Sequence, residues 1–373
     1  FGIKHLNLKK ESKKVSKKIS KENEDDKKII DSIPEQIISA PFAHLHNNTQ
    51  FSVLQSTSRI GNLVKKAGES NMSAIAITDR GNMMGCFHFI KAIKNYNSSI
   101  SEDSEKTQIK PIIGCELNVC SNHKDKSNRD DGYQIVFLAK NKNGYRNLSK
   151  MCSIGYTEGF YYVPRVDRSI IEQYKSDLIV LSGNMYGEIA NKLLNIGESQ
   201  AEDALMYWKN LFGDDFYLEM MKHGQEDEDR VNETLLEFSK IQNVKVVPTN
   251  NSFYLNKEDA NAHDILLCVK DGEKQATPIG RGRGFRYGLK NQEYYFKTSN
   301  EMKFLFRDYP DFFSNISEIV EKVELYELAR EVLLPKFKIP ADFKTENSDD
   351  LENEYLKFLT FNGAKKHYKN LDK

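Results

Sequence analysis

Residues 42–52 read FAHLHNNTQFS, and the fold can be inferred outward from this stretch. A short apolar run ends in His44 and His46, and alternate residues of a strand share one face. Both imidazoles are therefore expected to point the same way, as the first ligands of a metal-dependent phosphoesterase site do. Whether a metal can still bind depends on the polar residues that follow the later strands.

Short apolar runs alternate with amphipathic helical stretches from residue 42 onward. Strands are expected over 42–46, 74–79, 111–119, 133–139, 178–183, 216–221 and 244–251. Helices are expected over 60–70, 84–96, 144–154, 188–194, 198–212 and 227–242. Several strands are almost entirely apolar, which is typical of parallel strands covered on both faces. The pattern predicts an α/β fold in which seven βα units form a closed parallel barrel rather than an open sheet.

Polar residues follow six of these expected strands. They are His44 and His46, Asp79 and Arg80, Glu116, Asn184, His223, and Asn250 with Asn251. A barrel of this kind carries its chemistry at the C-terminal ends of its strands. The sequence therefore predicts a polar cleft on one rim.

The composition excludes several classes of protein. Lys+Arg and Asp+Glu number 54 each, so the net charge gives no sign of a nucleic-acid binder. The five cysteines include no C-x-x-C pair, which favours buried free thiols in a reducing, cytoplasmic compartment. Neither a signal peptide nor a run of 18 apolar residues is present, so no membrane association is expected.

The two ends of the sequence indicate a piece of a longer protein. It begins with Phe1 rather than Met and ends in helix-like sequence. Residues 1–40 are rich in lysine with interspersed acids, which predicts a charged linker. A DNA-binding arm is the alternative, and the acids disfavour it.

Further stretches carry a family resemblance. They read AITDRGNM (76–83), KPIIGCE (110–116), GYTEGFYY (155–162), LSG (181–183), FGDDFYLE (212–219) and YLNKEDANAHDILLC (254–268). Together with the His-x-His they resemble the polymerase-and-histidinol-phosphatase (PHP) domain of bacterial DNA polymerase III alpha subunits. The resemblance implies a distorted (β/α)7 barrel over residues 41–310, after a linker over 1–40. EYLK (354–357) and GAKK (363–366) resemble the start of the polymerase body, which would occupy 311–373.

The resemblance also shows what the site has lost. Active PHP domains hold a three-metal cluster with nine ligands, of which His44, His46 and Glu116 match. The six positions without the expected ligand are Gln55, Arg80, Gln134, Asn184, Asn251 and Phe253. Amide oxygens hold transition metals poorly, and Arg80 places a permanent positive charge where a metal would lie. We expect no metal and no cofactor here, and a hydrogen-bonded network of His44, His46 and Glu116 around Arg80, which pairs with Glu116 or Asp79.

The resemblance implies a template-directed DNA polymerase as the full-length protein. Its palm aspartates would lie beyond residue 373, with Mg²⁺, so no catalytic residue is expected in this part. Implied partners are DNA, dNTPs and replisome subunits such as the sliding clamp. GIKHLNLKK (2–10) resembles the junction after a fused proofreading exonuclease domain, which would supply the editing that a metal-free barrel cannot. The alternative is a metal-dependent PHP phosphoesterase or 3′–5′ exonuclease.

A basic loop could also touch nucleic acid. Residues 280–290 read GRGRGFRYGLK and contain Arg281, Arg283, Arg286 and Lys290 beside two aromatic residues. Such a loop can pair with phosphates and stack on bases. Two interpretations of this loop stay open. Either it contacts nucleic acid, or it is braced by arginine–carboxylate pairs. If it contacts nucleic acid, a single-strand-binding module is a third possible function of the chain, besides the polymerase and the phosphoesterase.

Overall fold

The computed structural model describes residues 29–101, 106–280, 282–329, 337–345 and 350–368. Most of the expected linker, the stretch 2–10 and Arg281 lie outside these residues. The chain forms two compact units, one ending at Tyr326 and the other beginning at Glu327.

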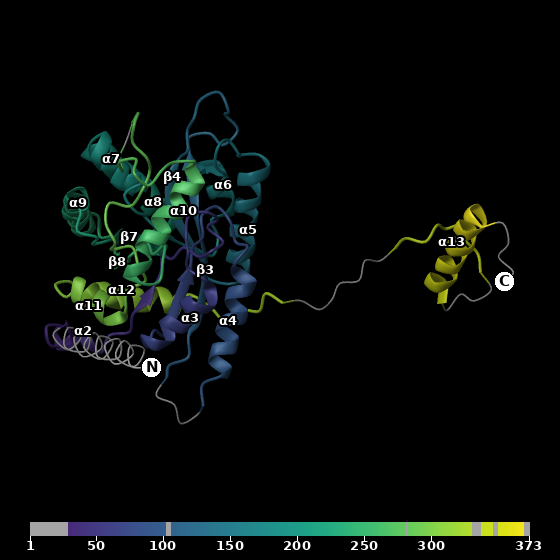
Figure 1. Cartoon of the computed structure of the whole chain (residues 1–373), viewed down its shortest axis with the longest axis horizontal. Helices are drawn as coiled ribbons and strands as arrows, with labels where there is room; N and C mark the ends of the chain where they lie inside the picture. The colour runs from purple at the N-terminus through teal and green to yellow at the C-terminus, as the bar shows by residue number, and fades with distance from the viewer. Residues whose placement is uncertain (1–28, 102–105, 281, 330–336, 346–349, 369–373) are drawn as a thin grey trace, which may run out of the picture. The chain divides into compact units, whose positions relative to one another are not determined.

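The first unit is built on a strongly curled sheet (Figure 1). Its strands are β1 (Ala43–His44), β2 (Ala74–Ile77), β3 (Lys110–Cys120), β4 (Tyr133–Ala139), β5 (Arg165–Asp167), β6 (Leu178–Leu181), β7 (Phe216–Met220) and β8 (Val246–Pro248). Seven of them run in the order β1-β2-β3-β4-β6-β7-β8, and β5 pairs with β3. Each predicted strand is present, and β5 is a short addition. The predicted α/β fold of the PHP type is therefore confirmed, and its sheet forms a strongly curled half-barrel.

The prediction that all strands run parallel is wrong for β4. This strand is antiparallel to both β3 and β6. Residues 121–132 connect β3 to β4 without a helix, and only antiparallel neighbours can be joined without a long crossover. The apolar sequence of β4 predicts that both of its faces are buried, but it does not predict the direction in which the strand runs. The two ends of the sheet meet through one bridge, between Asn47 and Ser252.

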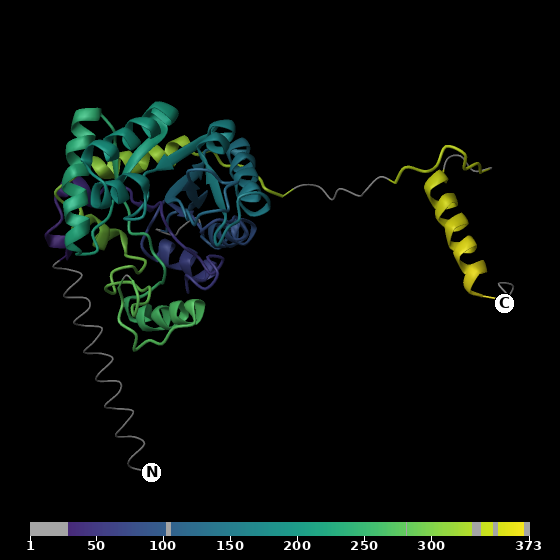
Figure 2. The same ribbon diagram turned by 90° about the horizontal axis from the view of Figure 1, so that it is seen from above.

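Helices lie around the outside of the sheet (Figure 2). They are α2 (Glu35–Ile38), α3 (Ile60–Glu69), α4 (Cys86–Ser98), α5 (Lys142–Thr157), α6 (Arg168–Tyr174), α7 (Glu188–Asn195), α8 (Glu198–Phe212), α9 (Glu226–Gln242), α10 (Ala260–Asp271), α11 (Ser299–Leu305) and α12 (Asp311–Lys322). Each expected helix is present. Val231, Leu235 and Phe238 of α9 are buried, as their helical spacing predicts. All five cysteines are buried free thiols.

The barrel unit continues past residue 310. Helix α12 packs on β8 and β1, with Phe313 6.3 Å from Phe42 between ring centroids. Asn315 also donates to the Val246 carbonyl at 2.8 Å. The apolar face of α12 thus packs into the core of the first unit. In the second unit α13 (Leu351–His367) has no buried residue. No helix within the described ranges is long and apolar enough to cross a membrane.

Candidate functional site

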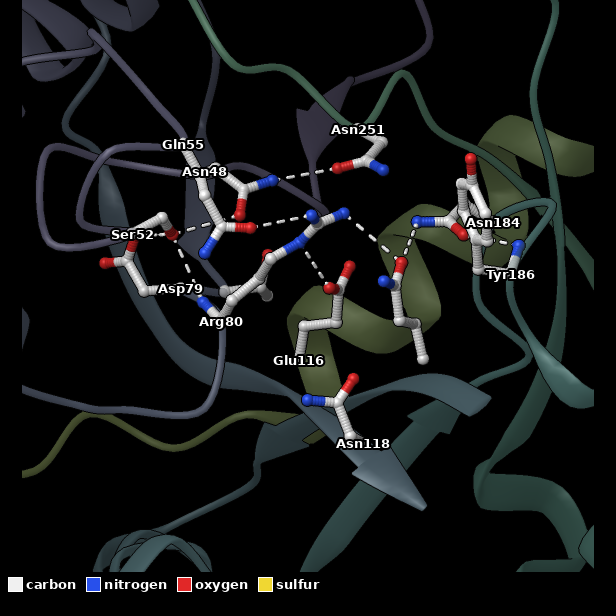
Figure 3. A network of polar contacts seen from close by, with 12 residues as sticks. Asn48, Ser52, Gln55, Asp79, Arg80, Glu116, Asn118, Asn184, Tyr186 and Asn251 are labelled. Carbon is white, nitrogen blue, oxygen red and sulfur yellow. Dashed lines mark hydrogen bonds and ion pairs between the residues drawn. The ribbon is translucent and has the colours of Figure 1, made fainter. Parts of the chain in front are cut away.

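Arg80 is the centre of the polar network at the strand ends (Figure 3). Its Nε lies 2.6 Å from Glu116 Oε1, and the side chain is 14% exposed. Its two terminal nitrogens donate to Gln55 Oε1 at 2.9 Å and Gln134 Oε1 at 3.2 Å. Asn184 donates to the same Gln134 oxygen at 3.0 Å. Gln55 and Gln134, two positions where the resemblance implies metal ligands, thus accept from the guanidinium, whose N–H groups need such acceptors when buried. Asn184 is linked to Arg80 only through Gln134.

Of Phe253 and Asn251, two further positions where the resemblance implies metal ligands, only Phe253 contacts Arg80. The Phe253 ring centroid lies 5.1 Å from the guanidinium carbon, in cation–π contact. Asn251 instead accepts a hydrogen bond from Asn48 at 2.9 Å. Its backbone is left-handed, with φ of +41°, which asparagine tolerates better than most residues. Asn251 thus ties β8 to the loop after β1 rather than to Arg80.

His46 extends the network on the far side of Glu116. Its Nε2 lies 3.0 Å from Glu116 Oε2 and its Nδ1 lies 2.6 Å from Glu219 Oε1. Burial opposes a charge on this ring, but the two carboxylates outweigh burial and raise the pKa of His46 to about 9. His46 is therefore an imidazolium at neutral pH. Both of its ring nitrogens face carboxylate oxygens and are thus engaged within the protein.

The pKa values of Arg80 and Glu116 shift in opposite directions, as expected for an ion pair. Burial favours the neutral form of Glu116, yet Arg80 and His46 together lower its pKa. Burial disfavours the charge on Arg80, but Glu116 and Tyr287 raise its pKa. Charges therefore alternate along Arg80, Glu116, His46 and Glu219, so that each buried cation contacts a carboxylate.

Glu219 was missed by the sequence analysis. It lies on β7, is 3% exposed and also accepts a hydrogen bond from Thr249 Oγ1 at 2.5 Å. The available signal was a carboxylate inside an apolar strand, FYLEM over Phe216–Met220. Acids are rarely buried without a partner, so this position indicated a buried cation opposite it.

His44 does not join the network, contrary to the prediction. Its Nε2 lies 2.8 Å from the Lys297 carbonyl oxygen, and its ring packs against Phe42 and Phe296. Burial lowers the pKa of His44 to about 3, so the ring is neutral. Alternate residues share one face only within a strand. Strand β1 ends at His44, so His46 lies beyond it and the two side chains need not point the same way.

Asp79 is not a partner of Arg80 either. Its carboxylate accepts hydrogen bonds from Thr49 N at 2.6 Å, Thr49 Oγ1 at 2.7 Å and Ser52 Oγ at 2.6 Å. Burial raises the pKa of Asp79. This side chain fixes the loop after β1, and Glu116 is the partner of Arg80.

A cleft of 540 Å³ lies beside Arg80, and His44, His46, Asp79, Glu116 and Asn250 of the predicted strand-end residues are not among its lining residues. Arg80, Asn184, His223, Asn251, Phe253 and Tyr287 are among its lining residues. His223 is held by Glu228 Oε1 at 2.7 Å and by the Asn250 carbonyl at 2.9 Å. Both ring nitrogens of His223 are thus engaged in hydrogen bonds within the protein.

This donor set does not fit a metal cluster. Within the described residues, no group of three or more His, Cys, Asp or Glu side chains is arranged to hold a metal ion. Glu116 pairs with Arg80, and both ring nitrogens of His46 face the carboxylates of Glu116 and Glu219.

The basic loop is divided between two roles. Arg286 is buried, with its terminal nitrogens 2.7 and 2.9 Å from the two Asp264 carboxylate oxygens and its Nε 2.9 Å from the Thr277 carbonyl. Arg286 is therefore a brace, one of the two interpretations left open, and its guanidinium is not available to a phosphate. Arg283 and Lys290 are exposed, and Lys290 lies 3.6 Å from Asp227.

Comparison with known proteins places this site in a family. Residues 44–223 match the PHP domain. DNA polymerase III subunit alpha of Borreliella burgdorferi is 37% identical over 335 residues, covering 88% of this chain and 27% of that protein. The Treponema pallidum and Aquifex aeolicus subunits are 33% and 32% identical, each over 88% of this chain and over 26% and 28% of their own lengths. The chain thus spans about a quarter of the relatives it matches. It carries a PHP domain and is homologous to the N-terminal region of bacterial DNA polymerase III alpha subunits.

Proposed function

We propose that this chain is the PHP region of a replicative DNA polymerase and that its barrel has a structural role. The observation that carries the proposal is the Arg80 guanidinium, paired with Glu116 at the position where the family resemblance expects a metal ligand. On this proposal the full-length protein is a DNA-directed DNA polymerase. The polymerase body would supply Mg²⁺-dependent nucleotidyl transfer and bind DNA, dNTPs and the sliding clamp.

The ion-pair chain cross-links the rim as a metal cluster would. Arg80 follows β2, Glu116 belongs to β3, His46 follows β1 and Glu219 belongs to β7. Gln134 adds β4 through its bond to Arg80. Alternating charges therefore join residues on or just after β1, β2, β3 and β7, and the neutral Gln134 side chain adds β4. Such a site supports rigidity rather than hydrolysis.

The division into a linker, a PHP domain and a polymerase lead-in remains part of the proposal, with the barrel extended to Tyr326. The lost ligands also support an editing activity outside the barrel, in an exonuclease domain fused upstream. Arg283 and Lys290 remain candidates for an auxiliary contact with nucleic acid.

A metal-dependent phosphoesterase or 3′–5′ exonuclease is the alternative, favoured only by the PHP match and the 540 Å³ cleft. Metal analysis of the purified chain, equilibrated with Zn²⁺ or Mn²⁺ and then desalted, separates the two functions. We expect far less than one ion per chain, an unchanged melting temperature in chelator, and no release of nucleotides from a 3′-labelled oligonucleotide. Stoichiometric metal that chelator removes with a loss of melting temperature would reject the structural proposal.

A further inference from the structure

Helix α5 carries an unusual distribution of charge. Its sequence, KNGYRNLSKMCSIGYT, contains three cations and no carboxylate. Lys142, Arg146 and Lys150 are spaced by four residues, which places them along one face of the helix. We call these three residues the basic stripe. The opposite face is buried and includes Leu148, Met151 and Cys152.

The basic stripe is not neutralised within the barrel. Arg146 and Lys150 are exposed and Lys142 is partly exposed. Among the described residues, several lysines and arginines form ion pairs with carboxylates, but Lys142, Arg146 and Lys150 do not. Three uncompensated cations in a row attract a polyanion, even in a chain whose net charge is zero.

Exposed aromatic rings continue from the C-terminal end of the stripe. Tyr156, Phe160 and Tyr162 are 45%, 47% and 62% exposed, and we call them the aromatic tips. The rings of Tyr156 and Phe160 are stacked, with centroids 6.2 Å apart. Arg129 lies over the Tyr162 ring at 4.7 Å. Rings beside cations are the combination that binds unpaired bases together with their phosphates.

The aromatic tips are held in place by a buried cation. Arg165 is 1% exposed and donates to the carbonyls of Gly159 at 3.0 Å, Asp130 at 2.9 Å and Asp125 at 2.8 Å. It thereby holds the loop that carries Arg129 against the segment after α5 that carries Phe160 and Tyr162. Tyr162 has a φ of +62°, an outlier for a bulky residue that persists only when its surroundings fix it. The rings are therefore organised before any ligand arrives.

The acids near the tips are already paired. Glu158 lies 3.8 Å from Lys124, and Asp131 lies 2.7 Å from Arg129. The uncompensated charge of this face is therefore that of the basic stripe.

The chain also leaves the barrel unit beside α5, where Tyr326 packs against Tyr145.

We propose that the basic stripe and the aromatic tips form one binding path for single-stranded DNA. Phosphates would pair with Lys142, Arg146 and Lys150, and bases would stack on Tyr156, Phe160 and Tyr162. Single strands are favoured over duplex because the rings can reach only unpaired, unstacked bases. This path is separate from the rim cleft and from residues 280–290.

Fluorescence anisotropy of the 373-residue chain with labelled oligo-dT of about 16 nucleotides tests the path over a range of salt concentrations. The triple variant K142Q/R146Q/K150Q should bind more weakly, and its log–log salt slope should be smaller in magnitude by roughly 2, at about 0.7 per phosphate contact on single strands. The matched control is K65Q/K240Q/R307Q, which also removes two lysines and one arginine, but from exposed positions outside the stripe. The control should retain the affinity and the slope of the unchanged chain.

The aromatic tips are tested separately. Tyr156→Ala and Phe160→Ala should each weaken dT binding by about five- to 150-fold and leave the salt slope unchanged. All variants should keep the melting temperature nearly unchanged, because none of the changed side chains is buried. Equal losses in stripe and control variants, unaltered binding by the alanine variants, or equal affinity for duplex DNA of the same length would each overturn the proposal. So would the absence of dT binding by the unchanged chain.

Discussion

At the scale of single residues, the Arg80–Glu116 pair stabilises the barrel only while both charges are present. Arg80→Ala should lower the free energy of unfolding by about 3–5 kcal/mol, because Glu116 would keep a buried charge opposed by His46 alone. Urea unfolding measures the loss. Arg283→Ala, an exposed arginine in the basic loop, is the control and should change stability by no more than about 0.5 kcal/mol. An unchanged urea midpoint for Arg80→Ala would show that the guanidinium is not a structural centre.

The charge on His46 makes stability depend on pH. Folding raises its pKa from 6.5 to about 9, so its stabilising contribution is complete below about pH 6.5 and disappears as the pH rises through 9. The pKa of Glu116 is lowered from 4.5, so its contribution is complete above that value and disappears as the pH falls. The two contributions are complete together between about pH 4.5 and 6.5.

His46→Gln should remove the alkaline part of this dependence. The unchanged chain should lose up to about 3 kcal/mol relative to this variant between pH 6 and 10. Urea midpoints at several pH values, taken as differences between the two proteins, cancel the lysines and tyrosines that titrate in both. Parallel curves for the two proteins over that range would mean that His46 is neutral in the barrel.

At the scale of elements, two helical glycines should respond to alanine in opposite directions. A Cβ at Gly144 in α5 would lie 2.1 Å from the Asp177 carbonyl oxygen, so Gly144→Ala must push α5 away from the loop before β6. A Cβ at Gly61 in α3 would meet nothing within 4 Å. Gly61→Ala should therefore stabilise by up to about 1 kcal/mol through helix propensity, and Gly144→Ala should destabilise despite it. Thermal melts check both signs, and stabilisation by both would contradict the close approach of α5.

At the scale of the whole molecule, α12 belongs to the barrel. A chain ended after Tyr326 should unfold cooperatively at the urea midpoint of the longer chain. A chain ended after residue 310 lacks the buried Phe312, Phe313, Ile316 and Ile319, each worth roughly 1.5–3 kcal/mol. Its midpoint should fall well below the other two. Equal midpoints for the two truncated chains would return the domain boundary to 310.

The sequence determined which segments form strands and helices, and the resemblance it carries implied at which positions an expected metal ligand is absent. Burial and helical period are local properties, so FYLEM and the Val231–Phe238 spacing reveal them without a partner. Arg80 is charged wherever it lies, so its conflict with a metal was visible from the residue type alone.

Only the tertiary structure decided which side chains meet. His46 joined the network and His44 did not, Glu116 rather than Asp79 paired with Arg80, and β4 reversed its direction. Arg286 was bound by Asp264, which lies 22 residues earlier in the chain. These choices depend on which strand ends and loops meet after the sheet curls. Residues such as His46 and Glu219, separated by 173 positions, become neighbours only then, and no local pattern records that distance.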